Sequence, residues 1–265
     1  MQKTNERFRI VKFPKVRHIY VELLRRGNKR NTIHAFIEMD VTTIRNYIRK
    51  VKEETGQSLS LTAYIAYCLG RALDKHKYIH AYRKGLSKLV VFNEVDIDIA
   101  IERKVKGSHA PVIPLTVRSA NTKTFMAIHE EIRKAQQEDV GKSNQSLKLF
   151  LLLPRFLEEW LMKVFWRRYF NNPFLRNRSG GTVMITAVGM FGGGAGWGLP
   201  IANHTLGITL GGIGKKPVVI NDEIKIREHM SVTLSFDHDI VDGAPAARFL
   251  QRVVQLIECP YLLFT

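Results

Sequence analysis

The sequence predicts a single mixed α/β domain, because segments with two different hydrophobic periods alternate along the chain. In some segments apolar residues recur at helical spacing, and in others they recur at every second position, which is typical of strands. No internal repeat and no low-complexity linker separates these segments. The chain has 265 residues, of which 45% are hydrophobic and 25% charged, and these values are ordinary for a soluble globular protein. We therefore expect one domain over residues 1–265.

Helices arranged around one strand are predicted in the first part of the chain. The expected elements are a helix over 15–26, a strand over 33–40, a helix to about residue 54 and a helix over 61–76. Asp40, with Thr42 and Thr43 close behind it, is a start signal for the second of these helices, and Gly56 is expected to end it. Ser58 or Ser60 is expected to cap the next helix, whose small and apolar residues on most faces are typical of a core helix.

Strands dominate the remainder, with one helix between them and one at the end. The predicted strands cover 88–92, 95–102, 111–118, 182–188, 205–212 and 231–236, with a hairpin over 217–227. A helix is expected over 122–137 and a last one over about 244–258, with Pro260 after its end.

The segment 145–178 interrupts this alternation. It is helical in propensity on either side of Pro154 and holds two Trp, five Phe and seven Lys or Arg against two Glu. One interpretation is a pair of helices packed on the domain or on another subunit. The other is an interfacial helix whose apolar face is buried in a membrane while its cations meet anionic headgroups.

The chain carries a large excess of positive charge. With 41 Lys and Arg against 24 Asp and Glu, the formal net charge is +17, which favours an anionic partner. The basic residues match no recognised nucleic-acid module, so nucleic acid is not the expected partner. Cys68 and Cys259 lie far apart, and the N-terminus lacks the apolar core of a signal peptide. We expect a cytoplasmic protein, with a peripheral membrane contact as the alternative for 145–178.

The stretch 231–258 carries the clearest chemical signal. A predicted strand leads to His238, Asp242 and Gly243 follow four residues later, and a helix begins immediately afterwards. A histidine is suited to general-base catalysis because its imidazole is largely neutral near pH 7 and accepts a proton readily. His76 and His80 have the i, i+4 spacing of a shared metal site, but no third ligand is evident, and no metal is expected.

These residues resemble the catalytic domain of the dihydrolipoyl acyltransferases of 2-oxo acid dehydrogenase complexes. The signature His-x-x-x-Asp-Gly of that family is shared with chloramphenicol acetyltransferase. The matching residues here are Phe236, Asp237, His238, Asp242, Gly243 and Ala244. Similar stretches are GTVMITAVGMFGGG, TLGITLGGIGKKPVV, VIPLTVRSANTKT and IHAFIEMDVTTI. The resemblance therefore covers nearly the whole chain except 145–178.

The resemblance implies a fold and an assembly. The fold is the two-layer α/β sandwich of the chloramphenicol acetyltransferase type, a mixed sheet with helices on one face. The family forms homotrimers with the active site at the subunit boundary, so His238 of one chain is expected to face a neighbour. The apolar tail 259–265 resembles the C-termini through which such trimers join into larger assemblies.

The resemblance also implies a reaction and its residues. The substrate is coenzyme A, and an acyl group moves between thiols with His238 as the general base. The family places a Ser or Thr hydroxyl at the developing oxyanion, and the matching residue is Thr186. The alternative is that Thr186 has no catalytic role and is present only because β-branched residues are favoured in strands.

Two further residues are implied to support the site. Asp242 is expected to orient the histidine loop by pairing with a basic residue, for which Arg17 is the nearest match and Arg25 or Arg26 are alternatives. Gly243 is expected to permit a backbone geometry or a close approach that a side chain would block.

The chain departs from the family pattern in two ways. Asp239 follows the histidine, where the family commonly has Arg. No lipoyl domain, subunit-binding domain or Ala/Pro-rich linker is evident within residues 1–265, so a lipoyl group is expected only in trans. Three functions stay open: a trans-acting component of a 2-oxo acid dehydrogenase-like system, a free-standing acyltransferase on a lipid or small molecule, and a catalytically silent trimeric scaffold.

Overall fold

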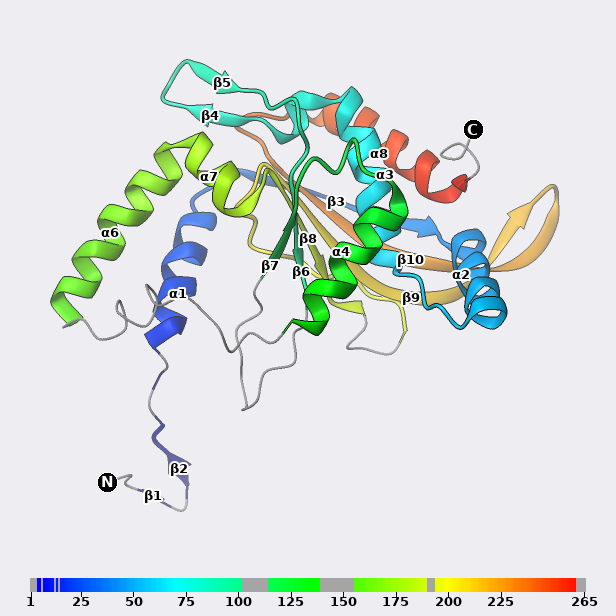
Figure 1. Cartoon of the computed structure of the whole chain (residues 1–265), viewed down its shortest axis with the longest axis horizontal. Helices are drawn as coiled ribbons and strands as arrows, with labels where there is room; N and C mark the ends of the chain where they lie inside the picture. The colour runs from blue at the N-terminus through cyan, green and yellow to red at the C-terminus, as the bar shows by residue number, and fades with distance from the viewer. Residues whose placement is uncertain are drawn as a thin grey trace.

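The computed structural model describes residues 4–5, 7–11, 13, 15–101, 114–138, 155–189 and 194–260 of the chain (Figure 1). At its centre lies a six-stranded sheet with the order β3-β10-β9-β8-β6-β7. Its strands are β3 (Thr32–Asp40), β6 (Ile97–Ala100), β7 (Pro114–Val117), β8 (Val183–Ala187), β9 (Leu206–Ile220) and β10 (Glu223–Asp237). Two short hairpins lie outside it, β1 (Thr4–Asn5) with β2 (Phe8–Arg9) and β4 (Tyr82–Lys84) with β5 (Lys88–Val90).

The helices begin and end close to the positions that the sequence predicts. They are α1 (Lys15–Gly27), α2 (Thr42–Thr55), α3 (Leu61–Lys75), α4 (Phe125–Gln137), α6 (Arg155–Asn171), α7 (Pro173–Gly180) and α8 (Gly243–Glu258), with a 3₁₀ turn at Lys77–His80. Ser60 rather than Ser58 caps α3, since its Oγ accepts a hydrogen bond from the Ala63 N–H at 3.2 Å. Gly56 ends α2 in the left-handed conformation, with φ of 74°.

The sheet is mixed, and one of its faces is covered by helices. β8 runs parallel to both β6 and β9, whereas the other neighbours are antiparallel. α3, α4 and α8 pack on one face and share a core with it (Figure 1). That core includes Ile97, Ile99, Val183, Ile185, Leu234 and Phe236 from the sheet and Leu69, Leu73, Ile128, Ile132, Phe249 and Val253 from the helices. The two-layer α/β sandwich is therefore confirmed.

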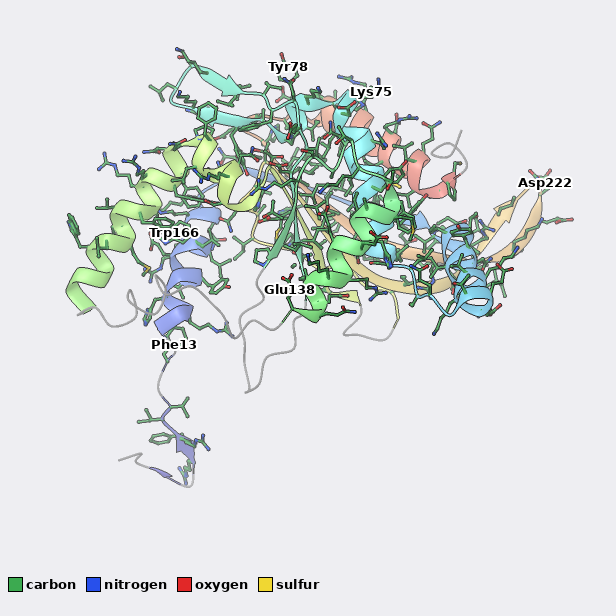
Figure 2. All side chains as sticks on the ribbon, in the orientation of Figure 1. Phe13, Lys75, Tyr78, Glu138, Trp166 and Asp222 are labelled. Carbon is green, nitrogen blue, oxygen red and sulfur yellow. The ribbon has the colours of Figure 1, made fainter. Side chains whose placement is uncertain are left out.

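β9 and β10 form one long ribbon, although the sequence predicts separate strands and a hairpin. Their pairing is continuous from Leu206↔Phe236 to Ile220↔Glu223, with one irregularity between Met230 and Val232. Asn221 and Asp222 close the ribbon with φ of 51° and 61°, the positive values that a tight hairpin turn requires. Figure 2 shows Asp222 at the tip of this ribbon, far from the helical layer.

The sequence predicts that the segment 145–178 is helical on either side of Pro154. Its C-terminal part forms α6 and α7, whereas residues 145–154 lie outside the described residues. Asn172 separates the two helices, and its side chain accepts hydrogen bonds from the N–H groups of Phe174 and Leu175. No described helix is long and apolar enough to cross a membrane. The tail predicted to mediate assembly is described only as far as Pro260.

Glycines allow the loop before β9 to lie directly on that strand. A Cβ on Gly211 would lie 2.0 Å from the Gly196 carbonyl oxygen, and one on Gly212 would lie 1.8 Å from the Gly194 carbonyl oxygen. Gly196 and Gly212 are paired as an isolated bridge. The close approach of the two backbones explains why this part of the sequence is so rich in glycine.

We predict that Gly211→Ala lowers the free energy of unfolding by about 1–3 kcal/mol, because the added methyl group must displace the loop. Gly196→Ala is the matched control, since its Cβ would meet nothing within 4 Å, and it should change stability by less than about 0.5 kcal/mol. Urea unfolding of both variants at one protein concentration measures the difference. Equal unfolding midpoints would contradict the account.

Candidate active site

His238 lies at the surface, in the turn between the end of β10 and the start of α8. Its backbone N–H donates to the carbonyl oxygen of Asn31 at 2.6 Å, and 43% of its side chain is exposed. Its Nδ1 lies 3.8 Å from Oδ1 of Asp242, the residue at the N-cap of α8. The backbone of the histidine is therefore fixed while its ring faces solvent.

Two residues before β3 hold the residues on both sides of His238. Arg30 Nη1 donates to Asp237 Oδ2 at 2.9 Å, and this pair is 16% and 8% exposed. Asn31 Nδ2 donates to Asp239 Oδ1 at 2.8 Å. Both acids that flank the histidine thus have partners of their own on the β3 side. We call residues 237–239 the histidine loop.

Arg30 and Asn31 are not among the site residues predicted from the sequence, but the pairing of β3 with β10 explains their position beside the histidine loop. β3 runs antiparallel to β10 and begins with the pair Thr32↔Asp237. Residues that precede β3 must therefore lie opposite residues that follow β10. Arg83, on β4, completes the surroundings of Asp239, with Nη1 at 3.6 Å from its Oδ2.

A second buried arginine lies beneath this loop. Arg176 on α7 is 4% exposed, and its guanidinium carbon lies 3.7 Å from the centre of the Tyr82 ring. Its Nη2 donates to the carbonyl oxygen of Asn203 at 2.7 Å. Burial, followed by the charge of Arg176, lowers the pKa of Arg30, which the charge of Asp237 opposes. Asp237 therefore offsets part of the cost of keeping Arg30 charged near Arg176.

A buried acid and a histidine lie close to Arg176. Asp98 accepts a hydrogen bond from the Thr116 hydroxyl, and its Oδ2 lies 4.0 Å from Nε2 of His204, which donates to the Gly180 carbonyl at 2.8 Å. Burial raises the pKa of Asp98 to about 6 despite the hydrogen bond from Thr116. Burial and then the charge of Arg176 lower the pKa of His204 to about 4. Both shifts favour uncharged forms, as expected for groups removed from water.

Thr186 lies far from His238 of the same chain. It is on β8, on the face opposite the core residues Val183 and Ile185, and pairs with Thr209 of β9, which pairs with Thr233 of β10. His238 is five residues beyond Thr233, or about 16 Å along the strand, and two strand spacings add about 10 Å across the sheet. One chain therefore does not bring the hydroxyl and the imidazole together.

The predicted basic partner of Asp242 is also absent from the described part of a single chain. Arg17 is exposed on α1 and forms no ion pair with Asp242 there. Arg25 and Arg26 both pair with Glu22, at 4.0 and 3.3 Å. The side chain of Asp242 is 85% exposed, and its Oδ1 has the imidazole of His238 as a neighbour.

Gly243 and the two spaced histidines have separate surroundings in a single chain. A Cβ on Gly243 would meet nothing within 4 Å and its φ is not positive, so one chain provides no steric reason for glycine. His80 is fully buried with its Nδ1 2.9 Å from the Thr182 hydroxyl, whereas the ring of His76 packs against Phe249. Within the ranges given above, no cluster of three His, Cys, Asp or Glu could hold a metal ion.

We predict that Arg30→Met lowers the free energy of unfolding by about 3 kcal/mol or more, because it leaves the buried Asp237 carboxylate without its cation. Adding Asp237→Asn to that variant should recover much of the loss, since the uncompensated charge is then removed. Arg83→Met is the matched control, because its pair with Asp239 is 44% and 40% exposed and should contribute less than about 1 kcal/mol. Urea unfolding that ranks Arg83→Met as costly as Arg30→Met would refute the assignment.

Comparison with known proteins agrees with this fold. The model of the family "2-oxoacid dehydrogenases acyltransferase (catalytic domain)" matches residues 5–145 and 175–265. A probable dihydrolipoyllysine-residue succinyltransferase of Schizosaccharomyces pombe is 26% identical over 94% of this chain and 50% of its own length. An acetyltransferase component of the pyruvate dehydrogenase complex from Rickettsia conorii is 26% identical over 99% of this chain and 57% of its own. The chain thus spans about half of the length of these relatives.

Solved structures show the same fold. A probable dihydrolipoamide acetyltransferase of Listeria monocytogenes superposes with a TM-score of 0.71, at 22% identity and with 96% of each chain covered. The dihydrolipoamide acetyltransferase of Azotobacter vinelandii gives a TM-score of 0.70, at 17% identity, covering 97% of this chain and 94% of the other. Because the family model matches residues 5–145 and 175–265, which make up most of the sequence, the chain belongs to the family of 2-oxoacid dehydrogenase acyltransferase catalytic domains.

Proposed function

We propose that this chain is a CoA-dependent acyltransferase that moves an acyl group between CoA and a thiol acceptor, with His238 as the general base. The observation that carries the proposal is the presentation of His238. Its backbone is held by Asn31, its Nδ1 is turned toward Asp242, and 43% of its side chain is open to a substrate. A carboxylate near Nδ1 favours the tautomer whose Nε2 accepts a proton.

The reaction balances with thiols and a thioester alone. The attacking thiol gives its proton to Nε2 of His238 while its sulfur forms a bond to the thioester carbonyl carbon. The carbonyl electrons move to oxygen, and a hydroxyl donor stabilises this oxyanion. When the carbonyl re-forms, the original carbon–sulfur bond breaks, and the leaving thiolate recovers the proton from the imidazolium.

A neighbouring copy is proposed to supply that hydroxyl from Thr186. The separation of Thr186 and His238 across a rigid sheet supports a site shared by two copies. The Azotobacter structure comes from work on a serine, a histidine and an asparagine in the catalytic mechanism, the serine 52 residues before the histidine and the asparagine four after it. Thr186 and Asp242 have the same separations from His238.

We also propose that the chain forms homotrimers or larger assemblies, since a site shared between copies requires an oligomer. A protein with a TM-score of 0.70 and 16% identity is the cubic core of a pyruvate dehydrogenase multienzyme complex. We further propose that residues 1–265 form one catalytic domain with an insertion at about 145–178. The family match, which stops at 145 and resumes at 175, supports this division.

The acceptor is proposed to be a dihydrolipoyl group carried by another polypeptide. Free-standing transfer to a lipid or small molecule is the second candidate, and the exposed aromatic and basic face of α6 favours it. The presence of His238, Asp242 and Thr186 together argues against a silent scaffold. Screening acyl-CoA thioesters against dihydrolipoamide and other acceptors separates these functions. The absence of turnover with every pair would favour the catalytically silent scaffold.

His238→Ala should lower the rate of acyl transfer by roughly 10²–10⁴-fold, because the thiol then loses its proton acceptor. His18→Ala on α1 is the control and should keep the wild-type rate. Thiol release from an acyl-CoA with dihydrolipoamide measures the rate, and circular dichroism checks the fold. Wild-type turnover in His238→Ala would exclude this histidine as the base.

Thr186 provides a test of the shared site. Thr186→Ser should keep most activity, whereas Thr186→Val should lose roughly 10²–10³-fold because the oxyanion loses a donor. When Thr186→Val and His238→Ala chains are refolded together, about one quarter of the sites would combine both native residues by random assortment. Activity should therefore return in the mixture. Light scattering must show an oligomer in each sample, and an inactive mixed oligomer would contradict the shared site.

A further inference from the structure

α6 is attached to the domain by one of its faces. Trp166 is 6% exposed and contacts Tyr169 and Phe170, with ring centres 5.4 and 5.8 Å away. The guanidinium groups of Arg26 on α1 and Arg176 on α7 lie 5.6 and 5.4 Å from the Phe170 ring centre. Figure 2 shows Trp166 on the side of α6 that faces α1. The inward face of α6 therefore already has its packing partners.

From Trp160 onward, where the structure describes the side chains of α6, the opposite face is exposed and its larger residues are apolar or cationic. Trp160, Lys163, Val164, Arg167 and Arg168 recur at helical spacing, and all are exposed. We call these five residues the outer stripe. Trp160 and Val164 are 59% and 47% exposed, as is the adjacent Phe165 at 51%. No Asp or Glu occurs in the sequence from 160 to 180.

The neighbouring surface has the same character. Lys84 of the β4–β5 hairpin lies with Nζ 5.2 Å from the ring centre of Phe174 on α7, so the hairpin and α7 are adjacent. Phe174 is 55% exposed, and Leu86 at the hairpin tip is 92% exposed. Residues 82–90 contain three Lys or Arg and no acid. In Figure 1 the hairpin, α7 and α6 follow one edge of the molecule.

We infer that this edge, led by the outer stripe, binds the surface of an anionic membrane. Exposed Trp, Phe and Leu beside Lys and Arg are the combination that an interfacial helix uses, with apolar groups in the headgroup boundary and cations on the phosphates. A contact between copies fits less well, since charged residues, and Lys in particular, are depleted at the centres of protein interfaces. The chain has only 24 acids against 41 Lys and Arg.

The membrane contact would place lipid close to the catalytic region. Arg83 belongs to the same hairpin, and its Nη1 lies 3.6 Å from the Asp239 carboxylate in the histidine loop. A lipid-borne acceptor would therefore reach the protein beside His238. The contact does not depend on the proposed acyl transfer and is tested without any substrate.

Co-sedimentation of the full chain with vesicles tests the inference. The vesicles contain phosphatidylcholine alone or with about one third phosphatidylglycerol, at about 0.02 M and about 0.5 M NaCl. The chain should pellet with the anionic vesicles at low salt and should dissociate at high salt as the charges are screened. A chain that stays in the supernatant with anionic vesicles at low salt would overturn the inference.

Variants decide whether the outer stripe is responsible. Lys163→Gln/Arg167→Gln/Arg168→Gln should weaken partitioning roughly 100-fold, about fivefold for each cation lost, and Trp160→Ala should weaken it as well. The matched control is Lys52→Gln/Lys75→Gln/Lys134→Gln, which removes three exposed charges from α2, α3 and α4. Equal losses in the two triple variants would show attraction by net charge alone and would refute the site. A change of oligomer mass in the stripe variant, without vesicle binding by the wild type, would assign this face to contacts between copies.

Discussion

The antiparallel pairing of β3 with β10 is the constraint on which the site depends. Nine residue pairs, from His229↔Asp40 to Asp237↔Thr32, align the two strands. The last pair places the residues before β3 against those after β10, which sets Arg30 against Asp237 and Asn31 against His238 and Asp239. Because side chains alternate along a strand, a slip of one residue would turn the core residues Leu234 and Phe236 toward solvent. The hydrophobic core therefore also sets the position of the histidine loop.

The same sheet explains why a single chain is incomplete. Thr186 and His238 are attached to a rigid, closely paired sheet, β8 near its middle and the histidine loop beyond the end of β10. No movement of a loop closes a gap of roughly 20 Å between them. The open space beside Gly243 and the exposed Asp242 carboxylate belong to the same surface. A second copy is the simplest source of the missing groups, and its proposed presence gives these features a common reason.

The segment that departs from the family pattern combines two surfaces in one helix. The inward face of α6 packs its aromatic rings against arginines of α1 and α7, whereas the outer stripe leaves Trp160 and its neighbouring cations in solvent. Aromatic residues occur on both faces of α6, so their spacing does not distinguish the packed face from the free one. The proposed membrane contact would use the free face without disturbing the packing beneath it.

The sequence by itself determined the local elements and identified the candidate histidine. Periodicity and end signals located the helices, including the end of α2 at Gly56 and a cap of α3 at Ser58 or Ser60, because these depend on neighbouring residues, and the structure decided for Ser60. The motif identified His238, Thr186 and Asp242 as candidates from residue types at set spacings. Pairings between distant residues were decided only by the tertiary structure. Arg30 lies 207 positions from Asp237, and nothing in the local sequence links the two residues. Strand register placed Arg30 beside Asp237, and the same register separated Thr186 from His238, because cross-strand neighbours are fixed by pairing and not by distance along the chain.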